Sequence, residues 1–363
     1  MRRSLAAIGL AAAAAWAVRE VPAAVGGKAR GDRAERISRS PQFHDGAFRN
    51  RAKARPVPPG AMRDILREML FGGVARKPSA PVPLVPPGPP ADRAEGLRIT
   101  WHGHATTLVE IDGARVLFDP VWSKRVSPSR RIGPRRLHKP PVPLADLPRV
   151  DAVVISHDHY DHLDMATIRA LADAQETVFV VPLGVGAHLE RWKVPGARIV
   201  ELDWSQETEV AGVRLVATPA QHFSGRTLTR DDTLWASWVV AGPTRKVFYT
   251  GDSGYFDGYA RIGAEHGPFD AALVQIGAYS DAWPDIHMTP EEGVAAHIDV
   301  RGGLLIPVHW ATFTLAVHSW TDPVDRVWAE AKAREVPLAV PRPGECVDVD
   351  NPPPVDPWWQ TLA

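Results

Sequence analysis

The stretch ISHDHYDHLD at positions 155–164 places three histidines and three aspartates within ten residues, directly after the apolar run 152–155. The apolar run predicts a buried strand, and Asp164 is suited to cap a helix that begins after it. The histidines and aspartates between these two elements are therefore expected on a tight loop. Imidazole and carboxylate groups gathered in this way are typical metal ligands.

The spacing within the loop divides the ligands into two groups. His157 and His159 are two residues apart, so they point the same way in an extended segment. Asp161 and His162 follow the turn and can face a second point a few ångströms away. Only 14 of the 363 residues are histidine, so this pattern is not expected by chance, and we interpret the loop as serving two adjacent sites.

Further ligands are expected at other strand ends, because one loop cannot complete two sites. Three candidates each end an apolar β-type run, namely His222, Asp252 and His309. With the loop they make five histidines and two aspartates, which suits two zinc ions or another divalent metal. Asp252 could bridge the two cations. Metals about 3.5–4 Å apart would bind a bridging water and lower its pKa, which provides hydroxide at neutral pH.

The composition excludes several other kinds of site. Lys+Arg and Asp+Glu both number 42, and this balance argues against a nucleic-acid partner, which usually requires a basic excess. Cys346 is the single cysteine, so an intrachain disulfide and a cysteine-rich zinc site are both excluded. Any metal must therefore be held by histidine and carboxylate.

The N-terminus has the features of an export signal. Arg2 and Arg3 precede the apolar stretch 5–18, and small residues at 21–23 offer a cleavage site. The stretch is short for a membrane-spanning helix, which needs about 20 apolar residues. We predict that residues 1–23 are a signal peptide, cleaved or kept as a membrane anchor, and that the protein is exported and periplasmic or membrane-associated. The alternative is an ordinary hydrophobic helix.

The rest of the chain divides into three parts. Short β-rich runs begin at residue 97, several of them apolar on both faces, and helical patterns lie between some of these runs. This alternation of strand-like and helix-like segments predicts an α/β domain of about 250 residues with its sheets covered by helices. The expected parts are an N-terminal extension at 24–95 with one short helix (60–73) and a proline-rich linker (76–93), the α/β domain at 96–350 with helices at 164–174, 289–300 and 321–336, and a C-terminal tail at 351–363.

Several longer blocks extend the pattern beyond the ligands. They include TWHGHATTLVEIDG, FDPVWSKRVSPSRRIGPRR, TPAQHFSGR, GDSGY, GPFDAALVQIGAY and VHWATFTLA, in this order. Together with the loop they resemble the binuclear zinc hydrolases of the metallo-β-lactamase superfamily, and within it the N-acyl-phosphatidylethanolamine-hydrolysing phospholipase D enzymes and their bacterial relatives. The resemblance implies a four-layer αβ/βα sandwich with two zinc ions at one edge.

The resemblance also implies a role for each ligand. His157, His159 and His222 would hold one zinc, Asp161, His162 and His309 would hold the other, and Asp252 would bridge them. True β-lactamases fit poorly, because they use a cysteine ligand where this chain has Asp252.

The same comparison suggests residues on the substrate side. His287 matches the family's substrate-side histidine, although the segment before it is shorter than in the phospholipase. We therefore expect Asp161, Asp252 and His287 to be catalytic. His104 would orient a ligand or contact substrate, and Asp119 is either a structural residue or an anchor for the loop beside the metals.

The basic loop 127–139 and the tryptophans offer further contacts. Arg130 and Arg131 are either solvated or bind a lipid phosphate or an anionic membrane surface. Trp310 is a core residue, a pocket wall or part of an acyl-chain groove. The expected partners are a phospholipid or membrane surface and a small-molecule substrate, with a homodimer as an open alternative.

Three functions remain open at this stage. The first is a phospholipase D-type phosphodiesterase that cleaves N-acyl-phosphatidylethanolamine-like lipids with a metal-bridging hydroxide. The second is a lactonase or a phosphodiesterase for a soluble substrate. The third is a membrane-associated module whose metal site is structural, although the complete set of seven ligands argues against it.

Overall fold

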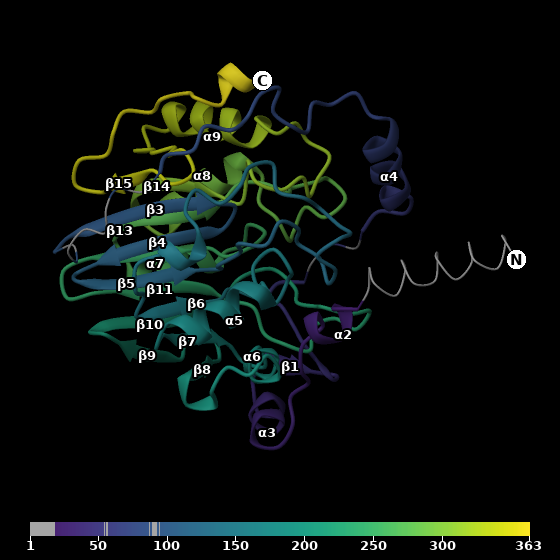
Figure 1. Cartoon of the computed structure of the whole chain (residues 1–363). Coiled ribbons are helices and arrows are strands. Elements are labelled where there is room, and N and C mark those ends of the chain that lie inside the picture. Colours follow the sequence, from purple (N-terminus) through teal and green to yellow (C-terminus); the bar gives the residue numbers. More distant parts are fainter. Residues whose placement is uncertain (1–18, 54, 56, 87, 89–92, 94) are drawn as a thin grey trace, which may run out of the picture.

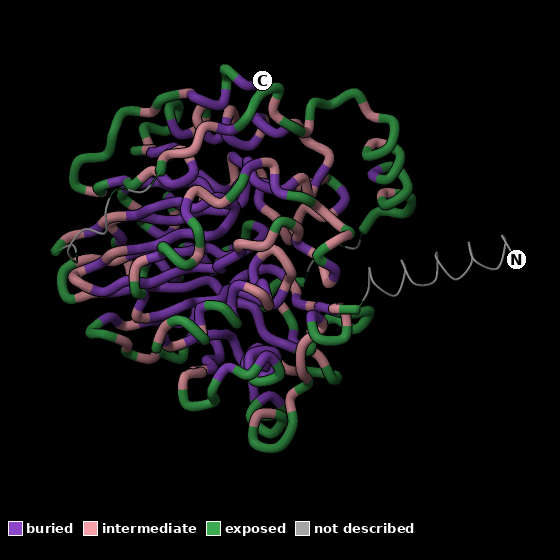
Figure 2. Tube along the Cα trace, viewed as in Figure 1, coloured by how far each residue is buried: buried purple, intermediate pink, exposed green. Residues whose placement is uncertain are grey.

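Two β-sheets packed face to face form the centre of the protein, and helices cover their outer sides (Figure 1). The computed structural model describes residues 19–363 except 54, 56, 87, 89–92 and 94. Buried residues concentrate in and between the sheets, whereas the connecting loops and the N-terminal helices are more exposed (Figure 2). The predicted α/β four-layer sandwich is confirmed.

The first sheet has seven strands and carries the histidine-rich loop. Neighbouring strands from β15 to β5 pair antiparallel, and those from β5 to β8 pair parallel. The strands in sheet order are β15 (Cys346–Asp348), β3 (Leu97–Gly103), β4 (Thr106–Ile111), β5 (Ala114–Phe118), β6 (Ala152–Val154), β7 (Val178–Pro182) and β8 (Ile199–Leu202).

The second sheet has six strands and supplies the remaining predicted ligands. Its strands β12, β13 and β14 are parallel, so their carboxyl ends lie at the same edge. The strands in sheet order are β14 (Gly302–Val308), β13 (Phe269–Gln275), β12 (Lys246–Tyr249), β11 (Ser237–Ala241), β10 (Val213–Thr218) and β9 (Glu207–Val210). The short strands β9 and β15 were not predicted from the sequence.

Alternation along each strand explains why the predicted runs are apolar on both faces. In β6, Val154 faces the core between the sheets, whereas Val153 faces the helices outside. In β7, Val180 likewise faces the core between the sheets, and Phe179 faces the helices outside. Burial on both sides therefore requires continuous apolar segments.

The outer helices begin where their capping residues predict. Asp164 caps α5 by accepting a hydrogen bond from the Ala166 amide, and Thr289 forms a capping box with Glu292 at the start of α8. Helices α5 and α6 pack on the seven-stranded sheet, and α7, α8 and α9 pack against the other. Their bounds are Met165–Ala174 (α5), Gly186–Arg191 (α6), Gly258–His266 (α7), Pro290–Asp299 (α8) and Asp322–Ala333 (α9). Single 3-10 turns occupy Leu144–Asp146 (η1), Gly196–Arg198 (η2) and Gln360–Leu362 (η3).

The N-terminal extension has more structure than predicted. The helix expected at 60–73 is α4, but the extension also contains two short helices and a two-stranded hairpin. These elements are α2 (Val21–Ala24), α3 (Asp32–Ser38), β1 (Phe43–His44), β2 (Ala47–Phe48) and α4 (Ala61–Phe71). Tertiary contacts stabilise the two short helices. Arg33 on α3 forms ion pairs with Glu190 and Glu201, and the indole of Trp192 donates a hydrogen bond to the Ala23 carbonyl of α2.

Residues 351–363, which the sequence analysis set apart as a C-terminal tail, pack onto the rest of the protein. Trp358 and Trp359 are buried, and both lie against Trp310. The indole of Trp359 also donates to Asp325 on α9 over 2.7 Å. These contacts make the C-terminus part of the core.

The membrane prediction falls mainly outside the described residues. The apolar stretch 5–18 belongs to the segment 1–18, which the structure does not describe. In the described part of the chain, no helix combines the length and apolar character that crossing a bilayer requires. The signal peptide or anchor at 1–23 and the exported location therefore stay predictions.

Candidate metal centre

The predicted ligands meet at one edge of the sandwich, in the loops that follow β6, β10, β12 and β14. Two further strands contribute: His104 follows β3 and Asp119 follows β5. His104, Asp119 and His309 all have positive φ, at 55°, 38° and 66°. Backbone of this kind is uncommon outside glycine and clusters at functional sites.

The first donor group consists of His157, His159 and His222. The Nε2 atom of His157 lies 2.8 Å from Nδ1 of His159, and Nε2 of His222 lies 3.3 Å from the same nitrogen. The three ligand atoms all lie within 4.8 Å of one another. The structure thus brings together the set that the sequence assigned to one metal.

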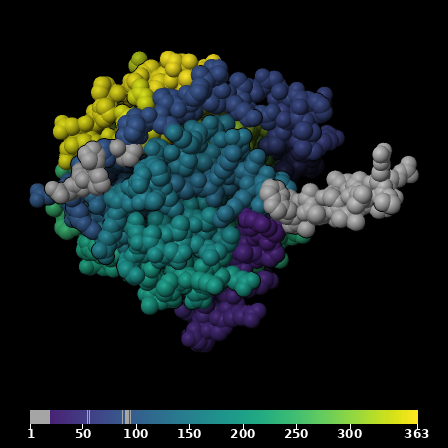
Figure 3. Space-filling view, in the orientation of Figure 1, coloured from purple at the N-terminus to yellow at the C-terminus, as the bar shows by residue number. Residues whose placement is uncertain are grey.

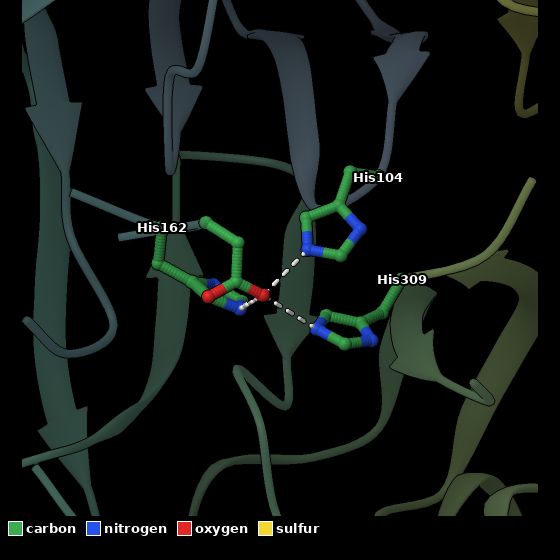
Figure 4. A group of neighbouring side chains, drawn as sticks. His104, His162 and His309 are labelled. Carbon is green, nitrogen blue, oxygen red and sulfur yellow. Dashed lines mark hydrogen bonds and ion pairs between the residues drawn. The ribbon is translucent and has the colours of Figure 1, made fainter. Parts of the chain in front are cut away.

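The second donor group surrounds Asp161 and has one more member than expected. Asp161 Oδ2 lies 2.9 Å from Nε2 of His104, 3.3 Å from Nε2 of His309 and 3.5 Å from Nε2 of His162 (Figure 4). The sequence predicted Asp161, His162 and His309 here but gave His104 only an orienting or substrate-contacting role. His104 ends an apolar β-run, as His222 and His309 do, and that signal could have identified it.

Asp252 connects the two groups. Its Oδ2 atom faces Nε2 atoms of five histidines, and its Oδ1 atom is buried without a hydrogen-bond partner. The distances from Oδ2 are 3.1 Å to His162, 3.2 Å to His309, 3.8 Å to His222, 3.8 Å to His287 and 3.9 Å to His157. One carboxylate in contact with members of both groups has the position that a bridging ligand requires.

Outer contacts turn the ring nitrogens toward this centre. The Nδ1 atom of His162 lies 2.7 Å from Asp119, and Nδ1 of His222 lies 2.8 Å from the Ile286 carbonyl. For His157, Nδ1 lies 2.9 Å from the Ser156 hydroxyl, which itself donates to Asp119 over 2.6 Å. A proton held on Nδ1 leaves the Nε2 lone pair free for a metal. Asp119 therefore anchors the loop beside the centre.

Burial and neighbouring charges give the donors different protonation preferences. Burial lowers the pKa of His157 and His222 well below the usual value, which favours the neutral, ligating form. Burial alone would raise the pKa of Asp252, but His162 and His309 hold it well below its usual range. Burial opposes protonation of His309, yet Asp252 raises its pKa to about 9. A bound cation would replace that proton as the partner of the carboxylates.

The donor chemistry fits two borderline metals of the zinc type. The described residues at the centre offer imidazoles and anionic carboxylates, and the orphaned Oδ1 of Asp252 has no protein partner that would satisfy it. Nitrogen and oxygen donors without thiolate suit zinc and related divalent ions.

The other predicted site residues lie at different distances from the centre. His287 is beside it, 3.8 Å from Asp252, and burial lowers its pKa to about 4. Arg130 and Arg131 instead face Glu20 of the N-terminal segment, at 3.3 Å and 3.9 Å. Trp310 is buried and stacks on Trp101, with ring centroids 5.5 Å apart.

Comparison with known proteins agrees with the fold and the donor set. Residues 114–310 match the family described as the beta-lactamase superfamily domain, which is more than half of the chain. The chain belongs to the metallo-β-lactamase superfamily. It is a metal-dependent hydrolase of that superfamily.

Relatives of this superfamily include both uncharacterised and named proteins. An uncharacterised protein of Mycobacterium tuberculosis is 52% identical over 363 residues and 96% of each chain. N-acyl-phosphatidylethanolamine-hydrolyzing phospholipase D 1 of Caenorhabditis elegans is 36% identical over 254 residues, which is 66% of this chain and 71% of that enzyme. Among solved structures, an isothiocyanate hydrolase from Delia radicum gut bacteria has a TM-score of 0.55 at 19% identity, covering 69% of this chain and 98% of the other. At that identity the likeness concerns the fold.

Proposed function

We propose that this hydrolase is a zinc-dependent phosphodiesterase of phospholipase D type that acts on N-acyl-phosphatidylethanolamine-like phospholipids. The observation that carries the proposal is the 36% identity to the Caenorhabditis elegans phospholipase over 71% of that enzyme. The arrangement of the donors supports it, since two metals joined by one carboxylate suit displacement at a phosphodiester.

The protein's own residues have separate tasks in this proposal. His157, His159 and His222 would hold one ion, Asp161, His162 and His309 would hold the other, and Asp252 would contact both. When bound, the two zinc ions supply Lewis acidity and lower the pKa of water. Asp119 and Ser156 keep the imidazoles of His162 and His157 aimed at the centre. His104 holds Asp161 through its 2.9 Å contact.

His287 is the residue we assign to the substrate. His287 lies within ligand distance of His222 and Asp252, but it belongs to neither of the two ligand sets that we assign to the ions, and its buried Nδ1 atom has no hydrogen-bond partner. A phosphoryl oxygen or the leaving alcohol would satisfy that atom. His287 therefore contributes to turnover rather than to metal content.

The test is a panel of lipids and lactones incubated with zinc-loaded protein, with products identified by mass. Release of an N-acylethanolamine together with phosphatidic acid is the expected result. His287→Ala should keep two zinc ions and lower turnover, whereas Asp252→Ala should lose metal and activity together. His44→Ala, which changes an exposed histidine on β1, is the matched control.

Two outcomes would contradict the proposal. Opening of lactones with every phosphodiester lipid left intact would make the enzyme a lactonase. Cleavage of soluble phosphodiesters alone would make it a phosphodiesterase of another substrate class.

A further inference from the structure

Helix α4 exposes the apolar face that an amphipathic helix normally buries. Met62, Leu66, Met69 and Leu70 have exposed fractions of 61%, 56%, 37% and 64%. At 100° per residue these four side chains occupy an arc of about 80–100° on one side of the helix. Phe71, at the end of the helix, is 82% exposed. At 100° per residue Phe71 projects about 100° beyond Leu70, so we call only Met62, Leu66, Met69 and Leu70 the α4 stripe.

The α4 stripe is distinct from the face by which α4 contacts the protein. Ile65 is the buried residue of the helix, with an exposed fraction of 8%. The helix stands at the edge of the molecule, with most of its length exposed (Figures 1 and 2). The surface of this region forms part of the outline at the upper right of the space-filling view (Figure 3).

The charge around the stripe is strongly positive although the whole chain is neutral. Segment 49–77 contains eight lysines and arginines but only two acidic residues. Arg63 and Arg67 follow Met62 and Leu66 by one position, so they border the stripe on one side of the helix. Apolar side chains bordered by arginines suit a helix that lies in a membrane surface, with its cations at the lipid phosphates.

The helix also lies beside the segment that leads to His287. An open hollow of about 460 Å³ lies between α4 and residues 280–282. Its lining mixes apolar side chains, including Ile65 and Val317, with the carboxylates of Asp64, Glu68 and Asp281. Arg55 ties the chain before α4 to Asp285 through a 2.6 Å ion pair. From Ala282 to His287 the chain can span at most about 18 Å. The stripe is thus close to the approach to the metal centre.

We propose that α4 is an interfacial helix that docks on an anionic phospholipid bilayer and places the metal centre beside it. The proposal rests on the lipid substrate proposed above, because only such a substrate requires the site to face a membrane. The net positive charge favours a bilayer of acidic lipids over a second copy of this chain, since two such basic segments would repel each other.

The test measures the environment of α4 itself, so that other membrane contacts of the full-length protein do not affect the result. A spin label is placed at Leu70→Cys, and in parallel at Arg39→Cys, the residue that follows α3, in a Cys346→Ser background. Arg39 is an exposed control, and α3 lies at the opposite end of the molecule (Figure 1). Vesicles of phosphatidylcholine, alone or mixed with phosphatidylglycerol, are then added to the zinc-loaded protein.

With acidic vesicles, the label at position 70 should lose contact with a water-soluble relaxing agent, and the label at position 39 should remain accessible to it. The combined variant Leu66→Ser/Leu70→Ser/Phe71→Ser should immerse less of the helix and weaken vesicle binding at least about tenfold. Leu228→Ser removes a fully exposed leucine from another loop and should change neither result.

Two results would overturn the proposal. One is a label at position 70 that stays accessible to water on vesicle-bound protein. The other is dipolar coupling between labels of two chains in the absence of vesicles, which would identify the stripe as a dimer contact. Failure of the proposed phospholipase D activity gives a different result from failure of the docking proposal. In that case the label at position 70 becomes immersed in the bilayer, but no lipid is cleaved. Conversely, the protein could cleave detergent-dispersed lipid while the label at position 70 stays accessible to water on vesicle-bound protein. That result would support the proposed activity and contradict the docking of α4.

Discussion

Replacement of Asp119 should damage both stability and metal affinity, because this carboxylate joins the core to the ligand loop. Asp119 is fully buried and accepts hydrogen bonds from the Ser156 amide at 2.7 Å, the Ser156 hydroxyl at 2.6 Å and His162 Nδ1 at 2.7 Å. The hydroxyl of Tyr249 also donates to it. The Asp119→Asn substitution keeps the shape of the side chain but removes its negative charge. It also replaces one acceptor oxygen with an NH₂ group, which cannot accept hydrogen bonds from these donors.

The size of the effect follows from these contacts. A hydrogen bond to a charged group contributes about 1.5–3 kcal/mol, and loss of one partner of a buried ion pair costs about 3–5 kcal/mol. We expect Asp119→Asn to reduce the free energy of unfolding by about 3–5 kcal/mol. At about 2–4 °C per kcal/mol for a domain of this size, Tm should fall by at least about 6 °C. His162 would also lose the group that orients its ring.

The assay combines thermal unfolding with competition for zinc by a chelator of known affinity. Loss of an orienting partner typically lowers metal affinity about 10–100-fold. Asp112→Asn is the matched control, since Asp112 accepts hydrogen bonds from the Thr244 and Arg245 amides at the opposite end of β5. It should lose some stability and no metal affinity. Wild-type zinc affinity in Asp119→Asn would refute the orienting role.

Four further changes test other contacts. His104→Ala should lower zinc affinity about tenfold or more in chelator competition, because it frees Asp161. Trp359→Ala should cost about 3–5 kcal/mol in urea unfolding, since this indole is fully buried. Gly26→Ala should cost about 1–3 kcal/mol in the same measurement, because Gly26 has φ +88° and a Cβ there would lie 2.2 Å from His188. Zinc at about 100 times its dissociation constant should add about 2.7 kcal/mol per site to the free energy of unfolding, or about 5.4 kcal/mol for two independent sites, and EDTA should reverse this gain.

The metal centre could be predicted because its ligands follow strong local signals. His222, Asp252 and His309 each follow an apolar run. Strands β12 and β14 belong to one parallel set, and β10 runs in the same direction because β11 is antiparallel to both β10 and β12, so all three carboxyl ends lie at one edge of the sheet. His104 follows a run of the same kind, and β3 runs in the direction of β5 and β6 because β4 is antiparallel to both β3 and β5. Which strand ends of the two sheets lie close enough to share a metal depends on the packing of the sheets, and the sequence pattern does not specify that packing.

The terminal segments could not be predicted for a different reason. Helix α3 is held by Arg33, whose partners Glu190 and Glu201 are 157 and 168 positions away. The C-terminal Trp359 likewise depends on packing against Trp310. Short segments of this kind have too few local contacts to be stable alone, so no local sequence pattern predicts them.

The N-terminal segment and the metal loop are joined through one buried guanidinium. Arg226 donates to the Ala24 carbonyl at 2.8 Å and to the Leu163 carbonyl at 2.9 Å, and it also donates to the carbonyl of Asp158 between two metal ligands. Its guanidinium lies 4.0 Å from the ring centroid of Tyr160, which belongs to the same loop. Residues near position 24 are therefore part of the scaffold that holds the ligand loop in place. A hydrolase domain considered from residue 96 onward would lack one of the partners that fix its metal ligands.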